Sequence, residues 1–207
     1  MTDQHNTNVL TDFTFANEIL NKQKPNTEEY INEFLEQRLP EFSIAQLRDP
    51  VFTKVLDEAN GRPLNIFQIG AIETLEGLAW RMGSGWSDII WGQYIKQYGG
   101  SLTIVDINMN HLGHSLLAAQ KLGYEVDLIY GDAIDHIESR DYDIYYLDGS
   151  NDPKEALDQY VKIRDKQSIV IIDDYNIKGT LIDKLKPKNF DHWEVFEGIA
   201  VIDTQEN

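Results

Sequence analysis

Residues 65–77 read NIFQIGAIETLEG, an apolar run that stops at Gly70 and is followed by a second glycine at Gly77. An apolar run of strand length that ends at a glycine and leads into a helix-like segment is typical of a strand-to-helix turn. Some turns of this kind hold a nucleotide-like cofactor, and others only join two elements. The residues farther along the chain have to separate these two readings.

From residue 64 onward, short apolar runs alternate with helix-like segments. This alternation predicts βαβ units and a parallel sheet that is buried on both faces. Two further runs near the C-terminus are split by Gly198 and predict a terminal antiparallel hairpin. The sequence therefore predicts an α/β fold, a Rossmann-like doubly wound and mostly parallel sheet. The expected strands are 64–69, 101–107, 124–130, 142–148 and 168–173, and the expected helices are 74–98, 109–122, 133–139, 153–165 and 179–185.

The first part of the chain has a different pattern. Residues 28–39, EEYINEFLEQRL, place apolar side chains on one helical face and are followed by Pro40, which stops a helix. We therefore expect two parts: an N-terminal helical extension at 1–60 and a Rossmann-like domain at 61–207. The amphipathic helix is also a candidate contact for a homodimer.

The charge and composition limit the possible partners. The chain has 18 Lys and Arg against 35 Asp and Glu, a net charge of −17, and such a field repels nucleic acid and anionic lipid. The absence of cysteine excludes disulfides and thiolate nucleophiles. No signal peptide and no apolar stretch of roughly 20 residues is visible. These features predict a cytoplasmic protein that acts on a small molecule and binds neither nucleic acid nor a membrane.

Acidic residues follow most of the predicted strands. In doubly wound sheets ligands bind at the carboxyl ends of the strands, near the point where the strand order reverses. Asp106 ends the second strand, where a carboxylate can accept hydrogen bonds from both ribose hydroxyls. It lies farther from Gly70 than the roughly 20 residues of the dinucleotide fingerprint, whose further glycines are also missing. A ligand with a ribose but no pyrophosphate is therefore favoured over NAD or FAD.

Asp132, in the segment YGDAID, follows the third strand. Its carboxylate could bind the exocyclic amine of an adenine. It could equally accept a backbone hydrogen bond as the N-cap of a short helix. The sequence leaves both roles open.

These motifs together resemble class I S-adenosylmethionine-dependent methyltransferases over about residues 60–203. The resemblance rests on Gly70, Asp106, the GDA segment and LDGSND, in that order along the chain. The segments YYLDGSNDPKEALDQY and SIVIIDDYNIKG are most similar to small O-methyltransferases, including the cation-dependent catechol and caffeoyl-CoA type. The resemblance implies S-adenosylmethionine as cofactor and O-methylation of a small hydroxylated acceptor.

The resemblance also implies roles for individual residues. Asp148 and Asp174 are the expected catalytic residues, and Asp148, Asp173 and Asp174 are the expected ligands of Mg²⁺. Three converging carboxylates would repel one another unless a cation neutralised them, and an all-oxygen set suits a hard ion. The expected cofactor-binding residues are Gln68, Gly70, Ala71, Glu73, Asp106, Ile107, Gly131, Asp132, Ala133 and Asp148.

Three positions depart from the family. Gln68 stands where the first strand usually ends in an acid, and the loop after it lacks the usual glycines. Glu73 could supply the missing charge or could be a first-turn helix acid. Asn151 stands where relatives often have a histidine. A catalytically inactive binding or scaffold domain therefore remains an alternative, as does another Rossmann-like nucleotide-binding enzyme.

Two further groups of residues have more than one interpretation. Trp80, Trp86 and Trp91 lie in or beside the insert 81–100, and they could line an acceptor pocket or pack in the core. His111 and His114 are three residues apart on a predicted helix, and we expect them on a solvated face.

Overall fold

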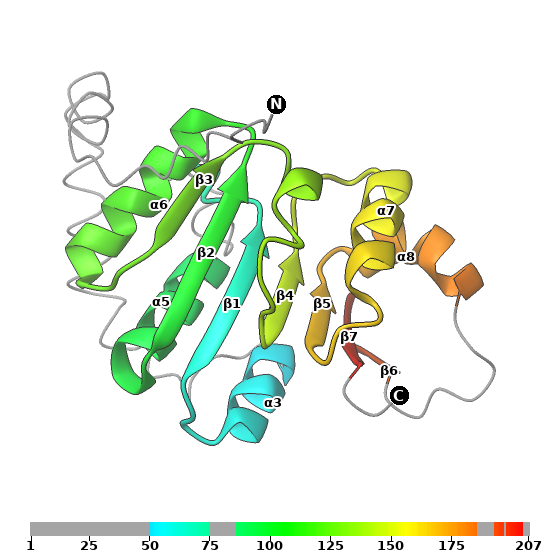
Figure 1. Ribbon diagram of the computed structural model, residues 1–207, viewed down its shortest axis with the longest axis horizontal. Coiled ribbons are helices and arrows are strands. Elements are labelled where there is room, and N and C mark those ends of the chain that lie inside the picture. Colours follow the sequence, from blue (N-terminus) through cyan, green and yellow to red (C-terminus); the bar gives the residue numbers. More distant parts are fainter. Residues whose placement is uncertain (1–49, 75–85, 186–192, 197, 205–207) are drawn as a thin grey trace, which may run out of the picture.

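The computed structural model describes residues 50–74, 86–185, 193–196 and 198–204 of the chain (Figure 1). The predicted helix at 28–39 lies outside these residues, as do Gly77 and Trp80. The division of the chain at residue 60 therefore stays a prediction. Within the described ranges, every helix is too short or too polar to span a bilayer.

The described residues form a seven-stranded sheet with the order β3-β2-β1-β4-β5-β7-β6. The first five strands pair in parallel, and β7 is antiparallel to both β5 and β6. The predicted doubly wound sheet and its terminal hairpin are thus confirmed. The strand order reverses at β1, which lies between β2 and β4. The strands are β1 Leu64–Ile69, β2 Gly100–Asp106, β3 Asp127–Tyr130, β4 Ile144–Leu147, β5 Ile169–Ile172, β6 Trp193–Phe196 and β7 Ile199–Asp203.

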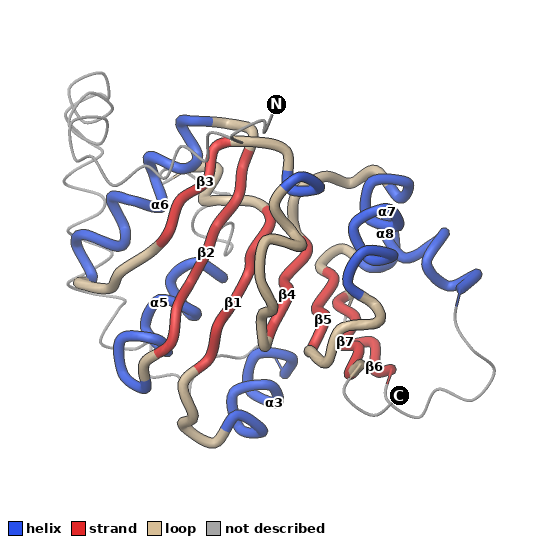
Figure 2. Tube along the Cα trace, in the orientation of Figure 1, coloured by secondary structure: helices blue, strands red, loops and turns tan. Residues whose placement is uncertain are grey.

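Helices cover both faces of this sheet (Figures 1 and 2). The helices α3, α5 and α6 pack on one face, and α7 and α8 pack on the other together with the 3₁₀ turn η3. Because both faces are covered, the central strands are buried on both sides and read as nearly continuous apolar runs. The helices are α3 Pro50–Ala59, α5 Trp86–Tyr98, α6 Met109–Leu122, α7 Pro153–Ile163 and α8 Tyr175–Ile182, and the 3₁₀ turns are η3 Ala133–Asp135 and η4 Asp183–Leu185.

Some predicted elements are longer than the observed ones. The expected strands at 124–130 and 142–148 begin too early because Tyr124 and Tyr142 are buried in the loops that precede β3 and β4. A buried loop residue and a strand residue look alike in an apolar run. The helix expected at 133–139 is only the short turn η3, whereas α6 has the predicted bounds.

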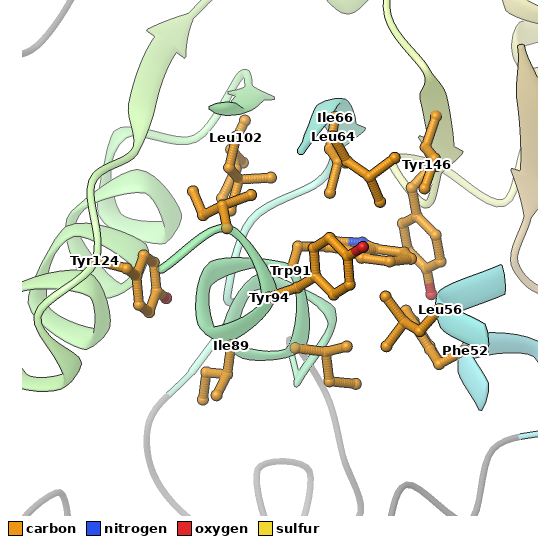
Figure 3. Packing of buried hydrophobic residues seen from close by; sticks show 14 of the residues in the cluster. Phe52, Leu56, Leu64, Ile66, Ile89, Trp91, Tyr94, Leu102, Tyr124 and Tyr146 are labelled. Atoms are coloured by element: carbon orange, nitrogen blue, oxygen red, sulfur yellow. The ribbon is translucent and has the colours of Figure 1, made fainter. Parts of the chain in front are cut away.

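An aromatic group lies beneath the sheet, between α3 and α5 (Figure 3). The ring of Trp91 is fully buried, and its centroid lies 4.8 Å from that of Phe52 and 6.1 Å from that of Tyr146. Trp91 is therefore a core residue and does not line an acceptor pocket. Trp86 is only partly buried at the start of α5 and packs against the same cluster.

Candidate functional site

Gly70 and Asp148 bring together the two strands at the reversal point. Gly70 follows β1 with a φ of +91°, and a Cβ at this position would collide with the carbonyl oxygen of Asp148. The backbone N–H of Asp148 donates to the carbonyl of Ile69 at 3.1 Å, which continues the β1–β4 ladder to this point. A glycine is therefore required here by the close approach of the two backbones, apart from any ligand.

Asp106 ties the Gly70 loop to the end of β2. Its Oδ2 accepts a hydrogen bond from the backbone N–H of Ala71 at 2.9 Å, and its Oδ1 accepts one from the N–H of Asn108 at 2.7 Å. Nδ1 of His111 lies 3.2 Å from the same Oδ2. A carboxylate has about four acceptor sites, so one site remains for a ligand hydroxyl.

The expectation that His111 and His114 lie on a solvated face was wrong. His111 contacts Asp106 and also Nδ2 of Asn108, through Nε2 at 2.9 Å. His114 is buried, and its Nδ1 lies 3.1 Å from the carbonyl oxygens of both Ile72 and Glu73, so this nitrogen must carry the proton. The three-residue spacing does place both rings on one side of α6, but that side faces the loop after β1.

Asp132 adopts the capping role that its position after β3 allowed. Its Oδ1 accepts a hydrogen bond from the N–H of Ile134 at 3.0 Å, at the start of η3. The side chain is otherwise exposed, so the second oxygen is still accessible to a ligand. The N–H of Gly131 donates to the carbonyl of Asp106 at 3.1 Å, and Ala133, two residues later, is buried.

Two exposed apolar side chains lie beside Asp106. Ile107 follows it directly and is 73% exposed, and Tyr130 is paired with Asp106 across the β2–β3 ladder and is 47% exposed. Ile107 was expected near a cofactor, and Tyr130 was not. The sequence feature that could have placed Tyr130 at this site is its position at the end of a strand, directly before Gly131. Both side chains offer apolar surface at the carboxyl edge of the sheet.

Asp148 forms an ion pair that the sequence did not reveal. Nζ of Lys178, from α8, lies 2.9 Å from Oδ1 of Asp148. The Lys178 side chain is 2% exposed and the Asp148 side chain is 33% exposed. Burial, together with the negative charge of Asp173, raises the pKa of Asp148 to about 7, and Lys178 opposes this rise. The sequence signal was a single charged residue, Lys178, within the α8 segment YNIKGTLI.

The three carboxylates expected to bind Mg²⁺ do not form a metal site in this structure. Oδ2 of Asp173 accepts a hydrogen bond from the Tyr146 hydroxyl at 2.9 Å, and its Oδ1 accepts one from the N–H of Asp174 at 2.8 Å. Asp174 has a φ of +49° and its side chain caps no N–H of α8. Among the described residues, no group of three potential ligands is arranged around an ion position. The Mg²⁺ prediction is therefore not supported, and the Lys178 ammonium already balances Asp148.

Gln68 belongs to a buried network that the sequence analysis missed. Its Nε2 donates to the carbonyl of Gly70 at 2.8 Å and also to Oδ1 of Asp88. Oδ2 of Asp88 accepts from the Ser115 hydroxyl, whose Oγ accepts from the N–H of Ile72 at 3.1 Å. Burial raises the pKa of Asp88 to about 7, although these hydrogen bonds lower it. The sequence signal was an acid within the apolar run WSDIIW.

The remaining predicted residues lie at the rim of this site. Ala71 is partly buried, and its N–H is already bonded to Asp106. Glu73 is exposed, so it does not join the Gln68 network. Its role toward a cofactor stays a prediction. Asn151 is exposed in the loop between β4 and α7, two residues before α7 begins.

The comparisons with known proteins concern the fold. No family model and no curated protein sequence matches this chain. The structure of the SAH-bound methyltransferase PaMTH1 from Podospora anserina superposes with a TM-score of 0.51 and 16% identity, over 87% of this chain and 88% of that one. MtNAS in complex with MTA and tNA gives a TM-score of 0.51 and 16% identity, over 91% and 74%.

A third similar structure is MycE, a methyltransferase from the mycinamycin biosynthetic pathway in complex with Mg and SAH. Its TM-score is 0.50 at 16% identity, over 89% of this chain and 51% of MycE, so the chain spans about half of that protein. The predicted fold is confirmed by these similarities. The chain has the fold of class I S-adenosylmethionine-dependent methyltransferases.

Proposed function

We propose that the protein is an S-adenosylmethionine-dependent methyltransferase that methylates an oxygen of a small hydroxylated acceptor. The main support is that Gly70, Asp106 and Asp148 all lie at the carboxyl ends of β1, β2 and β4, on either side of the point where the strand order reverses. This is the place where doubly wound sheets bind their ligands.

The side chains at this edge fit an adenosyl group. Asp106 has one acceptor site left for a ribose hydroxyl, and Ile107 and Tyr130 offer apolar surface for the adenine beside it. The second oxygen of Asp132, next to Gly131 and Ala133, can accept a hydrogen bond from the adenine amine. Oε1 of Gln68 is buried and has no hydrogen-bond partner among the described residues, so it suits a donor from the methionine part.

Asp148 is the proposed general base. S-adenosylmethionine, when bound, supplies a methyl group activated by the positive sulfonium. Asp148 would accept the proton of the acceptor hydroxyl, because a pKa of about 7 is well matched to a base at neutral pH and a third of the side chain is accessible. Lys178 orients the carboxylate of Asp148. The carboxylate of Asp174, which does not cap α8, would orient the acceptor.

The carboxylates of Asp148, Asp173 and Asp174 do not favour a metal ion that would hold the acceptor. MycE was crystallised with Mg, whereas in this chain a buried ammonium neutralises Asp148. No step of the proposed reaction is therefore assigned to an ion. Dialysis against EDTA should leave turnover within roughly two-fold of the untreated protein, and recovery of lost activity by Mg²⁺ would contradict this.

Two alternatives remain open to test. A binding or scaffold domain without turnover is favoured by Gln68 at the end of β1 and by the three hydrogen-bonding groups already on Asp106. Another Rossmann-like nucleotide-binding enzyme is the second alternative. MtNAS was crystallised with MTA. The product formed from the cofactor, S-adenosylhomocysteine or MTA, should therefore be measured.

Calorimetry with S-adenosylmethionine and S-adenosylhomocysteine tests the proposal. We expect micromolar binding of both, a loss of about 100-fold in Asp106→Ala, and no change in Asp158→Ala on the exposed face of α7. Binding of neither ligand by the folded protein would rule out the proposed function. Mass spectrometry of the products with hydroxylated acceptors would then distinguish S-adenosylhomocysteine from MTA, and binding without any product would favour the scaffold.

The same proposal includes a small-molecule acceptor, no binding to nucleic acid or to a membrane, association as a homodimer, and a cytoplasmic location. Light scattering of the full chain at several concentrations measures the oligomeric state directly.

A further inference from the structure

Asp88 holds the loop after β1 from both of its ends. One carboxylate oxygen accepts a hydrogen bond from Gln68, whose amide also donates to the carbonyl of Gly70. The other oxygen accepts from Ser115, whose hydroxyl accepts the N–H of Ile72. One side chain of α5 thus reaches the carbonyl at the start of the loop and the N–H at its end, in each case through one neutral side chain.

The carboxylate of Asp88 is unusual because it is buried without a positively charged partner in the described part of the chain. It is 0% exposed, and no other acid among the described residues is as fully buried. The described residues place no cation in ion-pair contact with it. Its hydrogen bonds come from two neutral side chains, the Gln68 amide and the Ser115 hydroxyl. A buried carboxylate without a counter-charge costs considerable free energy, so its persistence calls for a compensating role.

We propose that Asp88 is a positioning residue for cofactor binding, which holds the Gly70–Ile72 loop in place and supplies a negative charge beneath it. This inference rests on the proposed function. The charge would make the loop favour the sulfonium of S-adenosylmethionine over the neutral thioether of S-adenosylhomocysteine. The two ligands differ only in the sulfur-bound methyl group and its positive charge, so a change in their affinity ratio when Asp88 is substituted reports on that charge.

The groups around Asp88 determine how its charge responds to pH. Gln68 on β1, Ser115 on α6 and the Ile72 N–H favour the ionised form, whereas burial and the negative charge of Asp148 disfavour it. The buried hydroxyl of Tyr124 is also close enough for the charge of Asp88 to act on it. Because burial dominates and raises the pKa of Asp88 to about 7, the free protein is partly protonated at neutral pH. A cationic ligand should then release a proton as it binds.

The test compares Asp88→Asn with the wild-type protein and with Asp158→Asn on exposed α7. Calorimetry at pH 7 in two buffers of different ionisation enthalpy gives both affinities and the number of protons released. We expect the preference for S-adenosylmethionine over S-adenosylhomocysteine to fall roughly ten-fold in Asp88→Asn, the effect of one partly screened charge. We also expect less proton release than in the wild type. Asp148 also titrates in this range, so only the difference between the proteins is assigned to Asp88.

Ser115→Ala separates the two parts of the proposal. It keeps the carboxyl group of Asp88 and removes the link to Ile72. Because the lost hydrogen bond also favoured the ionised form of Asp88, Ser115→Ala and the wild type are compared at pH 9, where Asp88 is ionised in both proteins. At that pH Ser115→Ala should weaken both ligands by a similar factor of roughly three to ten and leave their ratio unchanged. It also serves as the informative variant if Asp88→Asn does not fold, because a change in the ligand ratio, or no change in either affinity, would overturn the inference. If Asp88→Asn folds, an unchanged ratio and unchanged proton release overturn the inference while the proposed function stands. If the wild type binds neither ligand, the proposed function fails and the inference fails with it.

Discussion

Nζ of Lys178 lies 2.9 Å from Oδ1 of Asp148, and this ion pair joins α8 to the end of β4 at the centre of the proposed site. The lysine is almost completely buried, whereas the aspartate keeps a third of its side chain exposed. The pair therefore neutralises a buried charge and still presents one carboxylate to the place where an acceptor would bind. Its energetic weight can be measured directly.

Lys178→Met should destabilise the protein by about 2 kcal/mol. Removing one partner of a buried pair typically costs about 3–5 kcal/mol, and the exposure of Asp148 reduces that figure. The matched control is Lys162→Met, which breaks an exposed pair with Glu138 at 2.6 Å and should cost less than about 1 kcal/mol. Urea unfolding measures both, and equal losses in the two variants would contradict the role of the buried pair.

The same substitution should shift the pH dependence of turnover. Without the ammonium, the pKa of Asp148 should rise further, because Lys178 is the main group that counteracts the rise in pKa caused by burial. The basic form would then appear only at higher pH. The pH profile of kcat/KM should move to the alkaline side relative to the wild type, and an unmoved profile would exclude Asp148 as the base.

Stability should fall as the pH rises from about 4 to about 7. The pKa values of Asp88 and Asp148 are raised from 3.8 to about 7 in the folded protein, so the folded state binds these protons more tightly than the unfolded chain. Their contribution is complete below pH 3.8 and is lost as the pH passes through the folded value. Asp88→Asn should flatten this part of the curve in urea unfolding between pH 4.5 and 8. An unchanged slope would show that Asp88 does not titrate there.

Gly70→Ala should cost about 3 kcal/mol or more in stability. The residue combines a φ of +91° with a Cβ position that collides with the carbonyl of Asp148. Gly99→Ala is the control, because Gly99 has a similar φ of +85° but the nearest atom to its Cβ is 3.8 Å away. It should lose only the strain of a positive φ, about 1 kcal/mol. Thermal or urea unfolding of both separates the collision from the strain.

His111→Ala should weaken S-adenosylmethionine binding by only a few-fold, far less than Asp106→Ala. His111 orients one oxygen of Asp106, whereas the N–H groups of Ala71 and Asn108 still hold the carboxylate in place. Calorimetry compares the two variants. A loss in His111→Ala as large as that in Asp106→Ala would mean that His111 itself contacts the ligand.

Local pattern was sufficient for much of the fold. The strand 64–69 and the helix 109–122 were predicted with the bounds that the structure has, because β1 is a short buried run and α6 is bounded by Asn108 as N-cap and Gly123 as C-cap. Segments where loop residues are buried were predicted less well. A buried loop tyrosine such as Tyr124 has the same apolar signature as a strand residue.

The sequence alone determined the order of strands and helices, the parallel sheet, and the acids at the strand ends, since these depend on residues close together in the chain. Only the tertiary structure decided how those acids are compensated. Lys178 reaches Asp148 across 30 positions, and Asp88 reaches Gln68 across 20 and Ser115 across 27. Whether a carboxylate faces a metal, an ammonium or a buried hydroxyl depends on such distant contacts, because charge is balanced in space and not along the chain.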